Sequence, residues 1–171
     1  MTTANDLLID GFDRVHQGVQ EVVEGLDEES LGFRPDPDAN SIAWLVWHLT
    51  RVQDDHLADA AGAAQLWTTA GWVERFGLPF DVQATGYGHG SEEVGQVRAG
   101  AELLVGYQDA VHESAVGYLR SLTDADYARV VDERWDPPVT LAVRLVSVVD
   151  DSAQHVGQAA YVRGLLERRP G

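Results

Sequence analysis

Apolar residues recur every three or four positions over four long stretches of the chain, a spacing that places side chains on one face of an α-helix. The stretches are residues 5–26, 41–61, 91–121 and 140–168. No two segments show the alternating apolar and polar pattern that is typical of paired strands. The pattern therefore predicts an all-α fold built on four long helices.

The segments between these helices indicate how they are connected. Prolines and turn-forming residues fill 33–41, and two prolines end the non-helical segment 130–139, so the first and last connections are short. The middle connection, 62–90, is long, rich in glycine and punctuated by large aromatic residues. This order predicts a four-helix bundle with a long crossover between helices two and three. Since no repeat or linker divides the chain, we expect residues 1–171 to form a single domain.

Polar residues at the helix starts support these boundaries. Asn40 or Ser41 suits the N-cap of the second helix, and Thr140 suits that of the fourth. Ser91 is followed by two glutamates, which favour the positive end of the helix dipole, and so marks the start of the third helix.

The chain is strongly acidic, with 28 Asp and Glu against 12 Lys and Arg and a formal net charge of −16 at pH 7. Such a charge repels phosphate backbones, which argues against nucleic acid as a partner. No stretch approaches the roughly 18 uninterrupted apolar residues that cross a bilayer, and residues 1–6 lack the pattern of an export signal. We therefore expect a cytoplasmic protein that does not bind membranes.

The chain contains no cysteine. This excludes disulfides, a thiolate nucleophile from the protein, and any cysteine-ligated zinc or iron–sulfur site. A metal ion would have to be held by histidine, aspartate or glutamate. Such residues matter most where they interrupt the apolar face of a helix, because bundles build metal sites from inward-pointing side chains.

His155 interrupts the apolar stripe of the fourth helix. That stripe consists of Leu141, Leu145, Val148, Ser152, Ala159, Val162 and Leu166. Asp151 precedes His155 by four residues, so both side chains can reach one ion from the same side of the helix. The same spacing is also typical of a simple hydrogen-bonded pair on a partly exposed face.

His48 lies in the most hydrophobic segment of the chain, between Trp47 and Leu49. A structural core histidine with partners for both ring nitrogens is one interpretation of such a residue. Two histidines and an aspartate, all in mid-helix among apolar neighbours, fit a metal-ligand set better than three unrelated buried polar groups. His48, Asp151 and His155 would suit zinc, nickel or ferrous iron and leave positions open for substrate or water, which points to catalysis or ligand binding.

Two segments resemble the metal-binding helices of the DinB-like superfamily. They are Asn40-Ser-Ile-Ala-Trp-Leu-Val-Trp-His-Leu-Thr-Arg-Val-Gln-Asp-Asp-His and Asp150-Asp-Ser-Ala-Gln-His-Val-Gly-Gln-Ala-Ala-Tyr-Val-Arg-Gly-Leu. They are most similar to the actinobacterial branch of thiol-dependent enzymes, which includes mycothiol S-transferases and mycothiol-dependent maleylpyruvate isomerase. The resemblance covers nearly the whole chain and implies a metal ion held by His48, Asp151 and His155.

The resemblance also implies an activity. A divalent ion, zinc by first choice, would activate mycothiol as co-substrate for transfer to an electrophile or for a thiol-assisted isomerisation. A metal-dependent hydrolase and a non-enzymatic metal- or small-molecule-binding stress protein are the alternatives. Many relatives carry histidine or glutamate where this chain has aspartate, so either Asp151 or Asp150 would supply the carboxylate. We expect a homodimer, the commonest assembly of soluble proteins.

Other polar residues would surround such a site. Asp55 lies seven residues after the histidine of the second helix, where it would hydrogen-bond a ligand or end the helix as a solvated acid. Arg51 and Arg144 would bind a substrate carboxylate or form surface ion pairs with the many acids. Asp55, Asp150 and Glu102 are the candidates for a general acid or base in the hydrolase alternative.

The remaining histidines fall into two groups. His16 and His112 lie on the apolar stripes of the first and third helices, where they would line the pocket or pack in the core with one hydrogen bond each. His56 and His89 are expected at the surface. The glycine-rich run around Tyr87 resembles a flexible lid, although it lacks the strand and helix of a phosphate-binding loop.

Overall fold

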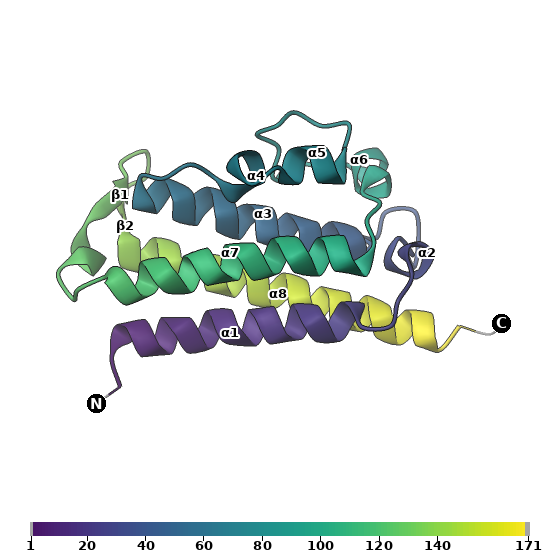
Figure 1. The fold of residues 1–171 in the computed structure, drawn as a ribbon, viewed down its shortest axis with the longest axis horizontal. Coiled ribbons are helices and arrows are strands. Elements are labelled where there is room, and N and C mark those ends of the chain that lie inside the picture. The colour runs from purple at the N-terminus through teal and green to yellow at the C-terminus, as the bar shows by residue number, and fades with distance from the viewer. Residues whose placement is uncertain (1, 170–171) are drawn as a thin grey trace.

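The computed structural model describes residues 2–169. Four long helices form its frame, namely α1 (Ala4–Val23), α3 (Ile42–Ala61), α7 (Ala101–Ser121) and α8 (Leu141–Glu167). They lie side by side as a four-helix bundle (Figure 1). The predicted all-α fold is confirmed, and the first, second and fourth helices begin and end within three residues of the predicted bounds.

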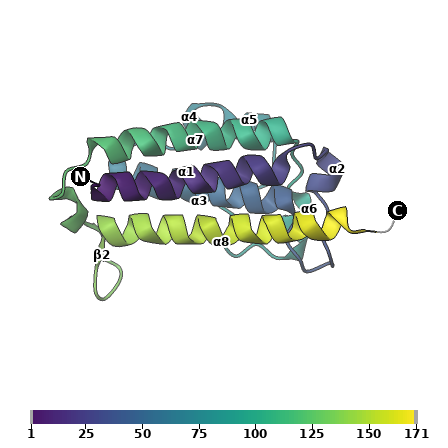
Figure 2. The same cartoon turned by 90° about the horizontal axis from the view of Figure 1, so that it is seen from below.

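The helices α1 and α8 run in one direction, and α3 and α7 run in the other (Figures 1 and 2). Side-chain contacts agree with this arrangement. Thr50 of α3 donates to Gln108 of α7, and farther along the same pair of helices Tyr118 donates to the main-chain oxygen of Ala60. The neighbouring helices α3 and α7 run parallel, so the chain between them must return along the length of the bundle. Residues 62–100 form this long connection, which confirms the predicted crossover.

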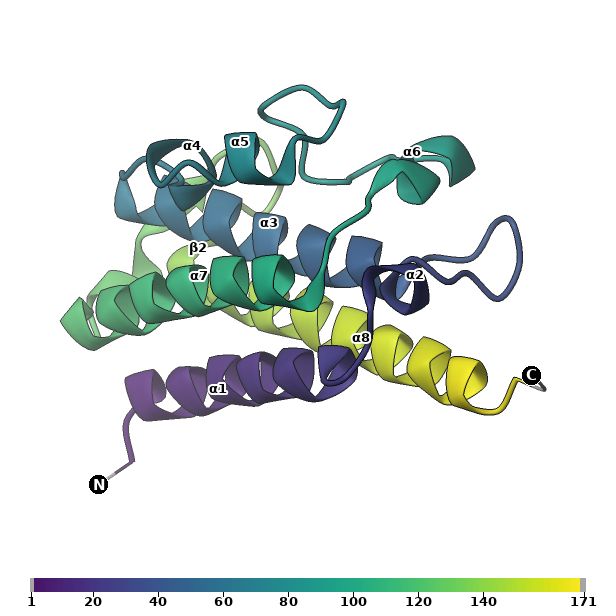
Figure 3. The same ribbon diagram turned by 45° about the vertical axis from the view of Figure 1, so that its right-hand side comes forward.

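Three short helices occupy the crossover, namely α4 (Leu66–Thr69), α5 (Trp72–Phe76) and α6 (Ser91–Gln96). Figure 3 shows α4 and α5 above α3 and α7, on the side of the bundle away from α1. The crossover is therefore a cover over α3 and not a loop that hangs in solvent.

The prediction of one continuous third helix over 91–121 was wrong. The chain leaves helical geometry after α6, and the four residues 97–100 separate α6 from the start of α7. Val94 and Val97 near this break and Leu104 within α7 are all buried in the same core. The spacing of apolar residues therefore continues through the non-helical segment between α6 and α7, so the sequence pattern does not show that the helix is interrupted.

The last connection contains the 3₁₀ turn η1 (Asp126–Ala128) and a small antiparallel sheet of β1 (Val130–Asp132) and β2 (Val139–Thr140). The sequence predicted a non-helical return here without paired strands, so the pairing is a correction. With three and two residues, the strands are too short to display an alternating pattern.

Capping residues begin the two helices that matter most for the site. The Ser41 side chain accepts a hydrogen bond from the main-chain nitrogen of Trp44 at the start of α3, and Thr140 does the same for Val143 in α8. Both match the predicted caps. The remaining short helix, α2 (Glu28–Leu31), lies in the connection before α3.

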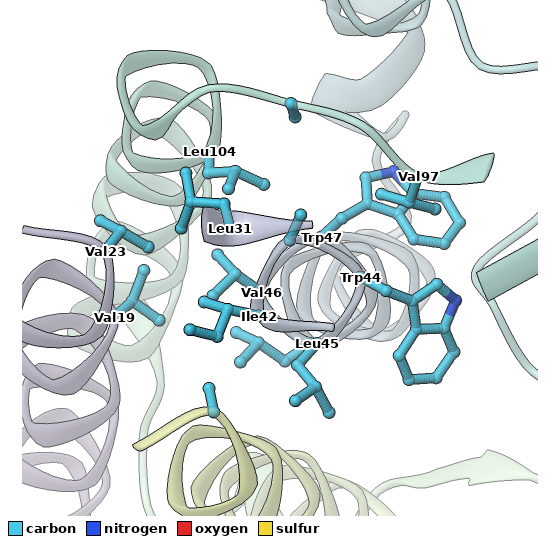
Figure 4. Packing of buried hydrophobic residues seen from close by; sticks show 14 of the residues in the cluster. Val19, Val23, Leu31, Ile42, Trp44, Leu45, Val46, Trp47, Val97 and Leu104 are labelled. Atoms are coloured by element: carbon cyan, nitrogen blue, oxygen red, sulfur yellow. The ribbon is translucent and has the colours of Figure 1, made fainter. Parts of the chain in front are cut away.

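The larger apolar core is centred on the first half of α3, where residues 42–51 are all buried. Figure 4 shows Val19 and Val23 of α1 on one side of α3, whereas Trp44 and Trp47 point to the opposite side. Because the crossover covers that opposite side, α3 is apolar almost all round. Within residues 2–169, no helix is long and apolar enough to cross a membrane.

Candidate metal centre

His48 lies in the middle of α3 with only 7% of its surface exposed. Its ring stacks on that of Trp44, with ring centres 4.6 Å apart. Its Nδ1 lies 2.6 Å from the main-chain oxygen of Thr85 in the crossover. Because a carbonyl oxygen only accepts hydrogen bonds, Nδ1 carries the proton, and the Nε2 lone pair is available to a metal ion.

Asp151 and His155 lie one turn apart on α8, beside α3. His155 donates its Nδ1 hydrogen to the main-chain oxygen of Asp151, 2.7 Å away, and so also keeps its Nε2 lone pair available. The rings of His48 and His155 meet edge to face, with centres 4.7 Å apart. The packing of α8 against α3 therefore brings the predicted residues together.

His48, Asp151 and His155 form a triad in which each residue offers a ligand atom within 4.8 Å of the others. Within residues 2–169, no other three or more histidine and acidic side chains bring their ligand atoms close enough together to hold a metal ion. The Oδ2 atom of Asp151 is buried without a hydrogen-bond partner. Such an oxygen is costly unless a cation or donor satisfies it. Two imidazoles and a carboxylate are donors that suit zinc, nickel and ferrous iron, so the triad fits a divalent metal ion.

The three residues differ in their electrostatics. Burial lowers the pKa of His48, and the hydrogen bond to Thr85 offsets this only in part. Burial by itself would raise the pKa of Asp151. The hydrogen bonding and positive charge of the neighbouring His155 have the larger effect, so the pKa of Asp151 lies below its usual value. Burial also opposes the charge of His155, yet the nearby carboxylate and main-chain oxygen of Asp151 raise the pKa of His155. A proton therefore competes with a metal ion most strongly at His155.

The structure distinguishes the two carboxylates that the sequence left as alternatives. Asp150 is exposed and accepts a hydrogen bond from Gln154 Nε2 at 2.8 Å. The Oδ2 atom of Asp151 lies 3.4 Å from His155 Nδ1, and the side chain is only about one-third exposed. The geometry therefore favours Asp151 as the carboxylate of the triad.

Arg51 follows the α3 histidine by three residues and is 0% exposed, so the expected surface ion pair is wrong. Its Nε donates to the main-chain oxygen of Ala84, and its Nη1 donates to the side chains of Gln65 and Tyr107. Asp54 Oδ2 lies 3.7 Å from Nη1. Arg51 therefore contacts the side of the crossover that packs on α3 and is not exposed to solvent.

Asp55 and Glu102 do not take part in the triad. Asp55 accepts a hydrogen bond from Gln65 Nε2 at 2.7 Å and lies 3.7 Å from His56, instead of approaching His48. Glu102 is exposed in the first turn of α7. Within the described chain, neither residue hydrogen-bonds to the triad, so the geometry supplies no support for either as a general acid or base.

Arg144 and His56 form a polar region at the opposite end of α3 from Trp44. Arg144 Nη1 donates to His56 Nδ1 at 3.2 Å, and Nη2 donates to Asp132 at 3.1 Å. Burial, followed by the charge of Arg144, lowers the pKa of His56. His56 is therefore half-buried, not exposed as predicted. The two side chains border a polar pocket of about 350 Å³ that Asp55, Asp59, Gln65 and Arg134 also line.

His89 was also expected at the surface but is held against the aromatic residues of α3. Trp44 donates its Nε1 hydrogen to His89 Nδ1 at 3.3 Å, and the His89 ring stacks on that of Trp47. Burial lowers the pKa of His89. Tyr87, by contrast, is 93% exposed between two glycines of positive φ. Whether this tip moves as a lid stays a prediction.

His16 of α1 and His112 of α7 stack on each other with ring centres 4.2 Å apart. Each ring also bonds to one carboxylate at 2.7 Å, His16 to Asp109 and His112 to Asp13. The pair bridges α1 and α7, whereas the triad joins α3 and α8. The two histidines therefore do not line the metal site. They are partly buried rather than in the core, and His16 Nε2 also lies 3.2 Å from Gln20 Nε2.

A groove of about 680 Å³ lies between the connection before α3, the start of α3 and the second half of α8, and none of the three triad residues lines it. Leu45 contributes to its floor, one turn before His48. Gln154 and Gln158 line it on either side of His155, together with Tyr161. The carboxylate of Asp36 also lines the groove, so amide, phenol and carboxylate groups surround an apolar floor that suits a polar small molecule.

Some features of the site gave no signal in the sequence. The Thr85 oxygen belongs to the main chain, so no residue type marks it. Arg51 did carry a signal, because a charged residue three positions after His48 lies near the same helix face, inside the most apolar segment. Such a residue indicates a buried partner in another part of the chain.

The chain matches known proteins in both sequence and structure. A family model described as mycothiol-S-transferase matches residues 7–168. A crystal structure described as the conserved protein of a locus from Enterococcus faecalis is 30% identical, with a TM-score of 0.92, and the match covers 99% of this chain and 100% of that chain. No curated protein matches the chain. Both matches extend over all four long helices of the bundle.

Proposed function

The chain belongs to the mycothiol-S-transferase family, and on that premise we propose that it uses a divalent metal ion to activate a low-molecular-weight thiol. His48, Asp151 and His155 would hold the ion. The observation that carries this assignment is the convergence of their ligand atoms within 4.8 Å. In the proposed reaction the thiol of mycothiol loses its proton, and its sulfur forms a bond to an electrophilic carbon as that carbon gives up its leaving group, so the whole thiol is transferred.

A divalent ion at the triad would lower the pKa of a thiol, because it stabilises the thiolate, which is the nucleophile. The protein supplies the setting for this chemistry. Main-chain oxygens of Thr85 and Asp151 hold the two imidazoles in the tautomer whose Nε2 accepts a metal. Three protein ligands leave coordination positions open, as catalytic sites require. Since the chain has no cysteine, the co-substrate would provide the sulfur.

The groove between α3 and α8 would receive the body of the thiol. Gln154 and Gln158 offer hydrogen-bond donors and acceptors without charge, and Leu45 supplies an apolar contact. His155 lies between Gln154 and Gln158 in the sequence of α8, next to the residues that line the groove. A co-substrate in the groove would therefore have its sulfur end near the triad.

Zinc is the ion that we propose, with nickel and ferrous iron as ions of similar donor preference. The same activated thiol would also serve a thiol-assisted isomerisation. We further infer a cytoplasmic homodimer that acts on small molecules and not on nucleic acid, in line with the net charge of −16. Light scattering would test the dimer, and the mass of a single chain would contradict it.

Elemental analysis of the purified protein tests the metal site. We expect about one zinc ion per chain in the wild type and little in His48→Ala, because the triad loses one of three ligands. His112→Ala is the matched control, since that histidine packs between α1 and α7. Equal zinc in the two variants, or none in the wild type after exposure to zinc, would remove the proposal.

An activity assay tests the chemistry. Metal-loaded and metal-stripped protein are incubated with mycothiol and monobromobimane, and formation of the conjugate is followed. We expect a faster reaction only with the loaded protein. Stoichiometric zinc without any acceleration would favour a non-enzymatic binding protein. Acceleration of ester hydrolysis without thiol would favour a hydrolase.

A further inference from the structure

The crossover reaches the proposed ligand His48 through its main chain. The Thr85 oxygen accepts the Nδ1 hydrogen of His48 at 2.6 Å. The next residue, Gly86, lies against the same ring. A Cβ atom at Gly86 would fall 2.6 Å from His48 Nδ1 and 3.1 Å from Trp47 Cζ3, and the residue has a φ of +96°. Both the close approach and the backbone conformation therefore require glycine.

Arg51 of α3 holds this part of the crossover through hydrogen bonds. Its Nε donates to the main-chain oxygen of Ala84 at 3.1 Å, immediately before Thr85. Its Nη1 donates to Gln65 Oε1 at 2.9 Å, near the start of the crossover. The guanidinium therefore joins the start of the crossover to its middle, two parts that are well separated in sequence. Asp54 provides the nearby negative charge, 3.7 Å from Nη1.

Burying an arginine completely is energetically unfavourable if its only role is to fill space. Removing a charge from water is unfavourable, and an apolar side chain of similar volume often serves packing at least as well. What an apolar side chain would lack is a set of directed donors for main-chain oxygens. Arg51 uses one of these donors on the residue that precedes the acceptor of His48. The arginine is thus suited to fix the position of a backbone segment.

We propose that Arg51 is a positioning residue for the metal site. It holds residues 84–86 so that the Thr85 oxygen keeps His48 in the Nδ1-protonated tautomer, with Nε2 available to the ion. Gly86 permits the approach. Hydrogen-bond partners of ligating histidines set their tautomer and orientation, and losing one typically lowers metal affinity roughly 10–100-fold. The inference rests on the proposed function, because it assumes that His48 binds the ion.

Two glycine variants give a matched test. Gly86→Ala introduces strain at positive φ and pushes against His48, whereas Gly88→Ala introduces similar strain, at a φ of +79°, with nothing within 4 Å of the new Cβ. Zinc affinity is measured by competition with a chromophoric chelator. We expect Gly86→Ala to bind zinc roughly 10–100-fold more weakly than the wild type and Gly88→Ala to stay within about threefold of it. Equal losses in the two variants, or none in Gly86→Ala, would overturn the inference.

The tautomer of His48 gives a readout that does not need a metal. In the metal-free wild type labelled with ¹⁵N at histidine, we expect a protonated Nδ1 and an unprotonated Nε2 for His48. Arg51→Met should mix the two tautomers of His48 while leaving the His112 signals unchanged, since His112 bonds to Asp13 on α1. Circular dichroism checks that the variant is folded. An unchanged His48 signature in folded Arg51→Met would contradict the role of Arg51.

The two measurements separate this inference from the function on which it rests. A wild type that binds no zinc removes the proposed function, and the tautomer of His48 then still decides whether the crossover controls that ring. If the wild type binds zinc and Gly86→Ala binds it equally tightly, the inference is wrong and the proposed function still stands. Where Arg51→Met does not fold, Arg51→Lys takes its place, because it keeps the charge but lacks the Nε donor to Ala84. An unchanged His48 tautomer in folded Arg51→Lys would contradict the role of Arg51.

Discussion

His48 on α3 and His155 on α8 meet edge to face, with ring centres 4.7 Å apart and an angle of 69° between the ring planes. Each donates its Nδ1 hydrogen to a main-chain oxygen, His48 to Thr85 and His155 to Asp151. Neither bond depends on a side-chain partner. Both rings are therefore fixed by backbone, which limits the rearrangement that binding of an ion would require.

The two adjacent carboxylates of α8 provide a matched pair of variants. We expect Asp151→Asn to weaken zinc binding by more than the roughly 10–100-fold that is typical of losing a hydrogen-bond partner of a ligand, because an amide is a poorer ligand for the ion. Asp150→Asn should bind zinc almost as the wild type does, since Asp150 is exposed and bonds to Gln154. Chelator competition measures both. A larger loss for Asp150→Asn would reverse the assignment.

Metal affinity should depend on pH chiefly through His155. A protonated imidazole does not bind a metal ion, and the nearby carboxylate and main-chain oxygen of Asp151 raise the pKa of His155 against the effect of burial. The pKa of His48 is lowered by burial, so that residue stays neutral to lower pH. As pH falls, we expect zinc affinity to decline by about tenfold per pH unit below the pKa of His155, with the decline beginning above the usual value of about 6.5.

Zinc competition at several pH values between about 5.5 and 8 would check this dependence, a range that brackets the ordinary pKa of histidine. An affinity that stays constant across the range would contradict it. Asp151→Asn is not a suitable control, because it changes both the pKa of His155 and the ligand set. His112→Ala should follow the wild-type curve.

Asp132 should make the fold more sensitive to acid. The side-chain and main-chain hydrogen bonds from Arg134, followed by the charge of Arg144, hold the pKa of Asp132 well below its usual range. A carboxyl with a lowered folded-state pKa contributes stability above its unfolded-state pKa of about 4, and this contribution is lost as pH falls toward the folded-state value. We expect Asp132→Asn to be less stable than the wild type at neutral pH.

Urea unfolding at a series of pH values tests that expectation. The difference in unfolding free energy between the wild type and Asp132→Asn should shrink as pH falls below about 4, where the native carboxylate begins to lose its advantage. Glu133→Gln, at an exposed neighbour of Asp132, serves as the control and should parallel the wild type. A difference that does not change with pH would show that packing, and not charge, makes Asp132 important.

The close contact between α1 and α8 depends on glycine. A Cβ atom at Gly18 would lie 2.6 Å from Val156 Cγ1, whereas a Cβ at Gly117 of α7 would meet nothing within 4 Å. We expect Gly18→Ala to destabilise the fold by about 1–3 kcal/mol, the usual cost of overpacking. Gly117→Ala should stabilise it by up to about 1 kcal/mol, because alanine favours helix. Thermal or urea unfolding measures both, and equal effects would contradict the packing argument.

The sequence by itself determined the helices and their order. The spacing of apolar residues, the caps Ser41 and Thr140 and the glycine-rich middle connection all act locally or through one helix face, so they are visible in the sequence. The same local geometry placed Asp151 and His155 together, since residues four apart lie above one another on a helix. Burial of His48 followed from its apolar neighbours.

Only the tertiary structure decided what covers each face. Arg51 is buried and His89 is held against α3 because the crossover folds back over that helix, and the periodicity of α3 does not show which distant segment covers it. The break before α7 was hidden for a related reason, since an extended segment can present apolar side chains to the same core as a helix. The Thr85 oxygen that orients His48 is a backbone atom, so no residue type announces it, and its place depends on chain far from His48 in sequence.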